Sequence, residues 1–245
     1  MEEKWVNKQR TLIVCSRGVS HQERHLITDL IRLLPHSKKE TKLDRKTQVS
    51  TLAELAEMHS CNNCIYLESR KHISFLWIAN FPSGPSAKFL LQSVHTSSEL
   101  KLSGNCLKGS RPLLSFDNSW SEKPQLQLLQ HMLTQTFSTP LKHPKSMPFV
   151  DHVLSFNQAQ NKIFFRNFEM IQSNSEIALV EIGPRFTLTP IKIFEGALTG
   201  ETLYKNEAYV NPREQEMKYK MEVKVKRRNK KNKQKFEVGP EESDE

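Results

Sequence analysis

Basic side chains in short polar loops are the residues of this sequence best suited to chemistry, and that chemistry is the binding of phosphate groups. Three such loops occur, at residues 38–46, 108–111 and 142–145. A single basic loop is usually just solvated, but three of them beside a basic tail favour contacts with a polyanion such as RNA. The phosphate contacts predicted from these loops are Lys42, Arg45, Lys46, Lys108, Arg111 and Lys145.

Two further basic residues follow glycine–proline pairs. Lys88 comes shortly after the pair at residues 84–85, where we predict that a helix begins, and a helix N-terminus presents free amide donors to a phosphate. A simple capped turn explains this segment equally well. Arg185 follows a second Gly-Pro pair in a predicted turn between strands, where it either binds a phosphate or forms a structural salt bridge with an acid such as Glu181.

The net charge of +9 comes from one segment near the C-terminus. The chain has 36 basic and 27 acidic residues, and residues 218–235 contain ten of the basic residues and one acidic residue. The rest of the chain is therefore formally neutral, so any basic surface on the folded part must come from local clustering. The tail favours sequence-independent phosphate contacts, which we predict for Lys224, Lys226, Arg227 and Arg228.

Patterns typical of catalysis or of metal binding are weak in this sequence. Cys61 and Cys64 form one C-x-x-C pair without the two further ligands that zinc needs, so we interpret them as small packed residues at a strand entrance. His21 and His25 have a spacing that suits metal binding on a helix, but no acidic motif accompanies them, and we interpret them as surface histidines. We predict no catalytic residue, no metal site and no cofactor.

The elements that must position these side chains alternate between strand and helix, which indicates an α/β fold. Ser20 and Glu23 form a predicted capping box at the start of a helix that ends before Pro35. Residues 36–48 are predicted as a loop, residues 140–148 as an extended connector, and residues 211–235 as a charged helix without an apolar face. Strands are predicted at residues 11–16, 65–68, 72–79, 91–95, 113–116, 149–156, 162–170, 177–182 and 186–194, and helices at residues 21–34, 51–58, 84–91 and 124–137.

The sequence also bears on the compartment. It has no apolar run of the roughly 18 residues that a membrane span needs, and it shows no secretory signal. Four cysteines are too few for a disulfide framework in a chain of 245 residues, which favours a reducing compartment, the cytosol or the nucleus. We predict no association with a membrane.

Several segments of the chain together resemble the Brix-domain family. The most specific of them is the stretch at residues 104–116, GNCLKGSRPLLSF. The resemblance covers about residues 4–210. The other segments that carry it are residues 11–18, 24–26, 29–30, 33–38, 41–46, 84–89, 143–146, 163–167 and 179–186.

This resemblance implies an α/β fold of two related halves, similar to anticodon-binding domains, followed by a basic C-terminal tail. Arg166 lies in one of the matching segments and completes the set of predicted RNA contacts. Pro190 departs from the family pattern, and a proline within a strand suggests an edge strand or a bend. The implied organisation is a short extension at residues 1–9, a Brix domain at residues 10–205 with halves at about 10–118 and 119–205, and a basic then acidic tail at residues 206–245.

The resemblance also implies a function. It implies localisation in the nucleolus of the nucleus, binding of ribosomal RNA, and a role in rRNA processing and in assembly of the large (60S) ribosomal subunit. The expected partners are ribosomal RNA and other large-subunit assembly factors in pre-60S particles, with no catalytic residue, no cofactor and no small-molecule substrate. Two alternatives stay open: a protein-interaction scaffold that touches RNA only through its tail, and an RNA-processing enzyme.

Overall fold

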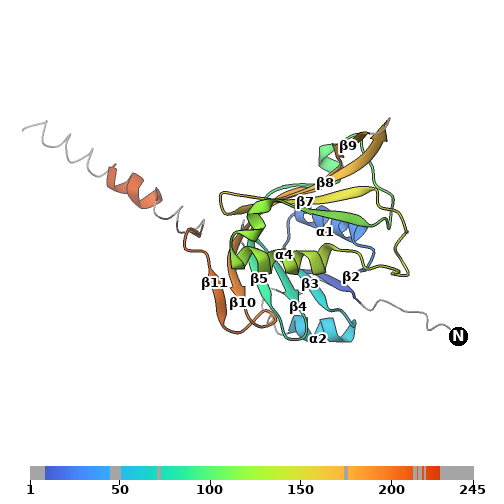
Figure 1. Ribbon diagram of the computed structural model, residues 1–245. Coiled ribbons are helices and arrows are strands. Elements are labelled where there is room, and N and C mark those ends of the chain that lie inside the picture. Colours follow the sequence, from blue (N-terminus) through green and yellow to red (C-terminus); the bar gives the residue numbers. More distant parts are fainter. Residues whose placement is uncertain are drawn as a thin grey trace, which may run out of the picture. The chain divides into compact units, whose positions relative to one another are not determined.

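The structure, a computed structural model, describes residues 9–44, 51–70, 73–173, 176–211, 214, 217 and 219–226 (Figure 1). By the contacts between its residues the chain divides into two units, Met1–Asn206 and Glu207–Glu245. All elements labelled in Figure 1 belong to the first unit. Among the described residues, no helix combines the length and the apolar character required to cross a membrane.

Helices and strands alternate in two parts of the first unit, and each part is followed by a run of successive strands. The helices are α1 (His21–Leu33), α2 (Thr51–Met58), α3 (Ser97–Leu100) and α4 (Pro124–Phe137), with a 3-10 helix η1 (Asn118–Ser121). The strands are β1 (Thr11–Cys15), β2 (Ser37–Lys39), β3 (Asn63–Arg70), β4 (Ile73–Asn80), β5 (Ser86–His95), β6 (Pro112–Phe116), β7 (His152–Ala159), β8 (Lys162–Ser173), β9 (Glu176–Glu181), β10 (Arg185–Phe194) and β11 (Thr202–Lys205).

The described strands form one sheet of eleven strands. Its main path runs β2-β1-β3-β4-β5-β10-β8-β7-β6, with β11 beside β10 and β9 beside β8. Each half of this path contains a parallel pair, β1 with β3 and β6 with β7, followed by antiparallel strands. A long helix comes between the strands of each parallel pair in the sequence, α1 in the first half and α4 in the second. Two related α/β halves therefore meet where β5 pairs with β10.

The pairing of β6 bears on where these halves join along the chain. The sequence predicts a boundary at about residue 118, which leaves β6 in the first half. Strand β6 runs parallel to β7, with Pro112 opposite His152 and Phe116 opposite Phe156. This topology favours a joint before β6, so we propose that the second half begins at about residue 112.

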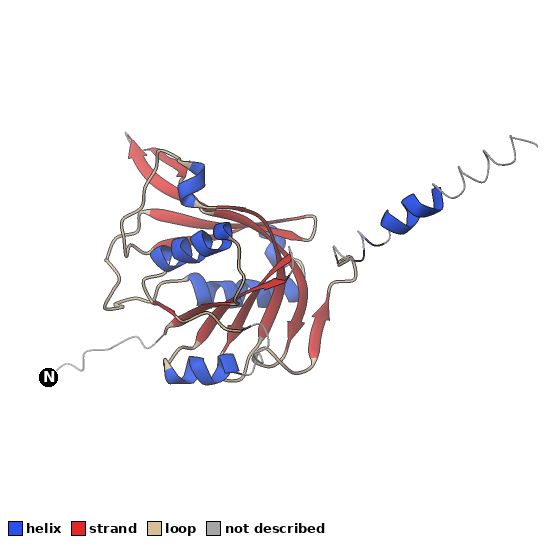
Figure 2. Ribbon diagram, turned by 180° about the vertical axis from the view of Figure 1, so that it is seen from behind, coloured by secondary structure: helices blue, strands red, loops and turns tan. Residues whose placement is uncertain are grey.

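One continuous core lies between the sheet and the helices α1 and α4 (Figure 2). Aromatic rings extend it across the second half, because Phe165 stacks on Phe186 at 4.4 Å and contacts Phe156 at 5.2 Å between ring centroids. Trp120 of η1 is fully buried beside them, and its indole Nε1 donates to Phe156 O at 2.9 Å. Burial of each such side chain stabilises the fold by about 1.5–3 kcal/mol, so this core fixes the surface loops that connect the strands.

The start of α1 confirms the predicted capping box. The Glu23 amide donates to the Ser20 hydroxyl at 3.2 Å, and the Ser20 amide donates to the Glu23 carboxylate at 2.6 Å. Two of the amides that a helix N-terminus leaves unpaired are satisfied in this way. The predicted helix at residues 124–137 is confirmed as well, with Pro124 in its first turn.

The predicted helix at residues 84–91 is wrong, because this segment forms the start of β5. Ala87, Phe89 and Leu91 all belong to the core, and a spacing of two residues is the period of a strand. Gly84 lies in the turn before the strand with φ +101, and a Cβ at this position would lie 2.2 Å from Glu195 O. The phosphate site predicted at a helix N-terminus beside Lys88 is therefore wrong too.

Two other expectations about loops and edges need correction. Pro190 lies in a central strand, because β10 has β5 on one side and β8 followed by β11 on the other. The register with β5 shifts between Pro190 and Lys192, which marks a bulge or irregularity where a residue without an N–H is tolerated. The predicted loop at residues 36–48 contains the short strand β2, which runs parallel to β1.

Candidate nucleic-acid interface

The loop at residues 104–111 packs against the connector at residues 143–149. The amide of Met147 donates to Gly109 O at 2.7 Å. A Cβ at Gly109 would lie 3.0 Å from Lys145 O, and the residue has φ +85, so glycine suits both the close approach and the backbone conformation. The fold therefore brings two of the basic loops predicted from the sequence together on one surface, which we call the loop surface.

Three predicted RNA contacts lie on the loop surface. Lys108 and Lys145 are exposed, and Arg111 is half-buried. Within the described part of the chain, none of the three forms an ion pair with a carboxylate. The Nε of Arg111 is buried and has no hydrogen-bond partner among the described residues. Cations without a carboxylate neighbour are available to pair with phosphate groups.

A buried polar cluster anchors the loop surface to the start of β7. The Leu107 amide donates to the Asp151 carboxylate at 2.7 Å, and the other carboxylate oxygen lies 2.6 Å from His152 Nδ1. The Ser110 hydroxyl lies 3.1 Å from the same His152 nitrogen. Burial alone would raise the pKa of Asp151, but the hydrogen bonds from His152, Ser110 and Leu107 outweigh it and hold the pKa below its usual value. A carboxylate that remains charged thus fixes the conformation of the loop.

Two other predicted RNA contacts, Arg166 of β8 and Arg185 of β10, lie beside a carboxylate. Arg166 Nη1 lies 3.1 Å from Glu181 Oε2, and Arg185 Nη1 lies 3.7 Å from Glu181 Oε1. Of the two readings of Arg185, the salt bridge with Glu181 is the one that the structure contains. Both arginine side chains stay about two-fifths exposed, at 42% and 38%. The one carboxylate that they share compensates half of their positive charge, so the cluster keeps a net charge of about +1.

Lys88 is paired as well. Its Nζ lies 3.5 Å from Glu68 Oε2 and 4.3 Å and 4.6 Å from the ring centroids of Phe75 and Trp77. Burial lowers the pKa of Lys88, and the charge of Glu68 opposes this change. For Glu68, burial would raise the pKa, but the hydrogen bond from Trp77 and the positive charge of Lys88 outweigh it and lower the pKa. This lysine forms an internal ion pair in the sheet and presents little charge to solvent.

The other predicted contacts are dispersed. Lys42 is exposed, next to Leu43, whose amide donates to Cys15 O at 2.9 Å. Lys224 and Lys226 are exposed in a helical segment of the second unit at residues 219–226. The remaining four predicted contacts, Arg45, Lys46, Arg227 and Arg228, lie outside the described residues.

Two basic residues near the loop surface lie outside the predicted set of contacts. Arg10 and Lys38 line a cavity of ≈ 340 Å³ together with Lys145 of the connector. Lys38 belongs to a basic segment that the sequence makes visible, but its place in β2 is what directs it to this cavity. No signal in the sequence distinguishes Arg10, because its importance depends on residues far along the chain.

The residues of the weak catalytic and metal-binding patterns are two buried cysteines and two neighbouring histidines on α1. Cys61 and Cys64 are buried free thiols, and burial raises the pKa of each. The rings of His21 and His25 lie 4.2 Å apart on α1, with 3.1 Å between their Nε2 atoms. Among the described residues, no group of three or more His, Cys, Asp or Glu side chains is placed to hold a metal ion.

Comparison with known protein families gives a match that spans most of the first unit. The Brix domain profile matches residues 16–192. The chain belongs to the Brix-domain family. Both the loop surface and the Arg166–Glu181–Arg185 cluster lie within the matched range.

Curated relatives are identical to the chain at about half of the aligned positions. A protein of Homo sapiens named "Ribosome biogenesis protein BRX1 homolog" is 55% identical over 210 residues, which are 85% of this chain and 59% of that protein. One of Xenopus laevis with the same name is 54% identical over 212 residues, covering 86% and 62%. "Ribosome biogenesis protein BRX1" of Saccharomyces cerevisiae is 47% identical over 221 residues, covering 86% and 76%. The chain thus spans about three-fifths of the length of its vertebrate relatives.

A solved structure shows the same fold. The crystal structure of a probable ribosomal biogenesis protein from Aeropyrum pernix K1 aligns with a TM-score of 0.51, and the alignment covers 74% of this chain and 96% of that chain. The two sequences are 15% identical there, so this likeness concerns the fold alone. The chain is accordingly a mixed α/β Brix domain, as the sequence predicts.

Proposed function

We propose that this chain binds ribosomal RNA as a non-catalytic factor in assembly of the large ribosomal subunit. The observation that carries the proposal is the 55% identity, over 85% of the chain, to a protein named for ribosome biogenesis. The loop surface supports binding of RNA in particular, because it presents cations without carboxylate partners from a rigid α/β body. The chain then acts in the nucleolus, beside other assembly factors of pre-60S particles.

The contacts of such a protein would be of two kinds. Lys108, Arg111 and Lys145 hold a short stretch of RNA by its phosphates, and the basic second unit adds contacts that do not depend on sequence. Neither kind involves a change in covalent bonds. The side chains best placed for chemistry, such as Asp151 and His152, are occupied in anchoring the loop.

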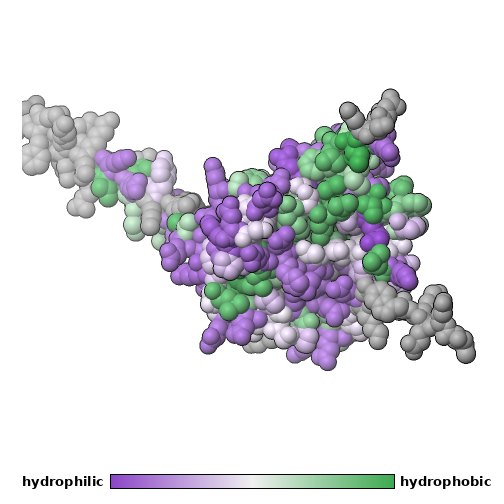
Figure 3. Space-filling model, viewed as in Figure 1, coloured by the Kyte–Doolittle hydropathy of each residue, from purple (hydrophilic) through white to green (hydrophobic). Residues whose placement is uncertain are grey.

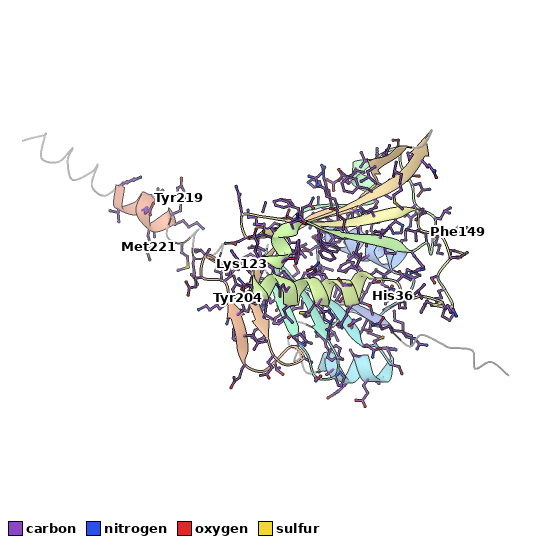
Figure 4. All side chains as sticks on the ribbon, viewed as in Figure 1. His36, Lys123, Phe149, Tyr204, Tyr219 and Met221 are labelled. Atoms are coloured by element: carbon purple, nitrogen blue, oxygen red, sulfur yellow. The ribbon has the colours of Figure 1, made fainter. Side chains whose placement is uncertain are left out.

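A scaffold that binds other assembly factors is the second candidate, and the exposed apolar residues of the same region favour it. The side chain of Phe149 is 58% exposed on the connector (Figure 4), and Ile177 and Leu179 are exposed on β9. Figure 3 shows apolar side chains gathered on this side of the first unit, near β7, β8 and β9. Exposed apolar surface marks sites of contact with other proteins. In the scaffold alternative, only the tail touches RNA.

Removal of the tail separates the two candidates, and salt dependence tests phosphate binding itself. We expect the full chain to bind single-stranded RNA with a steep fall of log K against log salt, because each neutralised phosphate contributes about 0.7 to the slope. A chain shortened to residues 1–206 should bind more weakly yet retain a salt-dependent affinity. Complete loss of binding in the shortened chain would favour the scaffold, and a flat salt dependence of the full chain would contradict phosphate binding altogether.

A further inference from the structure

A basic cavity lies where the start of β1, the short strand β2 and the connector meet. It has a volume of ≈ 340 Å³ and is lined by Arg10, His36, Lys38, His143 and Lys145, among others. This volume is within the range of about 300–1,000 Å³ typical of ligand sites. Figure 4 labels His36, which comes just before β2 in the sequence and contacts the C-terminal end of α4.

The three cations of the cavity have no carboxylate partner within the described part of the chain. Lys38 Nζ donates to a backbone carbonyl, that of His59, at 3.4 Å. An ammonium group has three N–H donors, so Lys38 keeps donors for a ligand. No aspartate or glutamate is among the described residues that line the cavity. The charge inside it is therefore positive and uncompensated.

Two histidines, His36 and His143, also line the cavity, and both are expected to be uncharged near neutral pH. His143 lines the cavity together with Lys145 and Arg10. Burial lowers the pKa of His143, and the positive charges of these two residues lower it further. Burial also lowers the pKa of His36 to about 4, and its Nε2 lies 3.1 Å from Thr136 O. The wall is thus a neutral, fixed surface, and the cations surround it.

We propose that this cavity binds a phosphate group of RNA, held by Arg10, Lys38 and Lys145. A guanidinium fork and two ammonium groups match the several oxygens of a phosphate. Lys145 also joins the cavity to the loop surface through the close contact at Gly109, so one strand can be held at both places. The proposal rests on the proposed function and names a site within it to which Arg10 and Lys38 contribute.

The first experiment compares RNA affinity in matched variants of the full chain. Fluorescence anisotropy with a labelled single-stranded RNA measures the affinity of the wild type, of the double variant Arg10→Gln/Lys38→Gln and of Lys145→Gln. The side chain of Lys145 is exposed, so its substitution leaves the fold intact. Lys162→Gln is the control, since this exposed lysine does not line the cavity. We expect the double variant to lose about tenfold in affinity, the size of one charge-assisted contact, and about 0.7 in salt slope.

The second experiment probes the cavity without RNA. Inorganic phosphate is titrated into the isotopically labelled chain, and amide shifts are followed by NMR. The amides of Ser37, Lys38 and Lys145 should move in the wild type and stay fixed in the double variant. RNA with a 5′-monophosphate and RNA with a 5′-hydroxyl distinguish the source: equal affinity indicates an internal phosphodiester, and tighter binding of the former indicates a terminal phosphate.

The outcomes separate this site from the proposed function. Wild-type affinity in the double variant would overturn the cavity as a phosphate site and leave RNA binding by the chain intact. A wild type that does not bind RNA, while a titrated polyglutamate peptide shifts the cavity amides, would overturn both and identify an acidic peptide as the ligand. Loss of RNA binding in the double variant with unchanged binding of the control supports the proposal.

Discussion

The cations of the loop surface and those in the centre of the sheet differ in what lies beside them. Lys108 and Lys145 extend from loops with no carboxylate in contact among the described residues. Lys88 and Arg185 extend from strands onto the carboxylates of Glu68 and Glu181. The same residue types therefore serve two purposes, and the neighbouring carboxylate decides between them. Free cations are available to a polyanion, whereas paired cations stabilise the sheet.

The largest expected effect is on the free energy of unfolding and comes from His36, which lines the cavity. Burial lowers the pKa of His36 in the folded chain from its ordinary value of 6.5 to about 4. Between these values the unfolded chain binds a proton that the folded chain does not, so stability is full above pH 6.5 and falls as the pH drops towards 4. We expect this loss to be on the order of 3 kcal/mol. Denaturant unfolding from pH 7 to pH 4 measures it.

His36→Leu isolates this contribution. Its unfolding free energy should depend less on pH across the same window, with a remainder from His143, whose pKa is also lowered. His21→Leu is the control, because this histidine is exposed on α1. An equally steep pH dependence in the His36 variant would show that the wall is not the neutral surface described.

The next effect tests the paired region. Lys88→Met keeps an apolar stem over Phe75 and Trp77 but removes the ammonium group from Glu68. We expect a loss of about 2 kcal/mol in unfolding free energy, since Glu68 is 12% exposed and its remaining partners among the described residues are Arg70 and Trp77. RNA affinity should stay within about twofold of wild type, which is within 0.4 kcal/mol. A large fall in RNA affinity at unchanged stability would show instead that Lys88 contacts RNA.

A smaller effect is expected for the shared carboxylate of β9. Arg166→Gln and Arg185→Gln should each reduce stability by less than about 1 kcal/mol, because both side chains are more than a third exposed and solvent screens the pair. Chemical denaturation provides the stability and anisotropy the affinity. If either variant binds RNA much more weakly than wild type, that arginine binds RNA despite its ion pair with Glu181. A carboxylate partner would then not exclude a cation from the RNA site.

The smallest effect on stability belongs to the loop surface. Lys108→Gln should change the unfolding free energy by less than about 0.5 kcal/mol. It should weaken RNA binding several-fold, with a fall of about 0.7 in the salt slope for one lost phosphate contact. The exposed Lys162 supplies the control substitution, as in the cavity experiment. Unchanged affinity in Lys108→Gln would remove this residue from the interface.

The sequence predicts those parts of the fold that depend on local signals. The capping box of Ser20 and Glu23 and the start of α4 at Pro124 are encoded within a few residues, and both are confirmed. Residues 84–91 carry a conflicting signal, because their Gly-Pro pair favours a helix start while Ala87 and Phe89 alternate as in a strand. Pairing with β4 and β10 on both sides decides for the strand.

The pairing of the cations depends on tertiary contacts and is beyond local patterns. Lys88 meets Glu68 because β3, β4 and β5 are neighbours in the sheet. Arg10 meets Lys145 only because the connector returns to the start of β1. The sequence supplies the basic residues, and the topology determines which of them have a carboxylate beside them. The family resemblance adds the expected fold but does not resolve this difference.

Mapping of RNA crosslinks on the protein tests the central claim most directly. The full chain is irradiated with bound RNA, and the crosslinked peptides are identified by mass spectrometry. We predict that crosslinks within the first unit concentrate in residues 104–111, in residues 143–149 and beside the cavity at Arg10 and Lys38. Crosslinks that instead gather around Arg166 and Arg185, with none on the loop surface, would contradict the account.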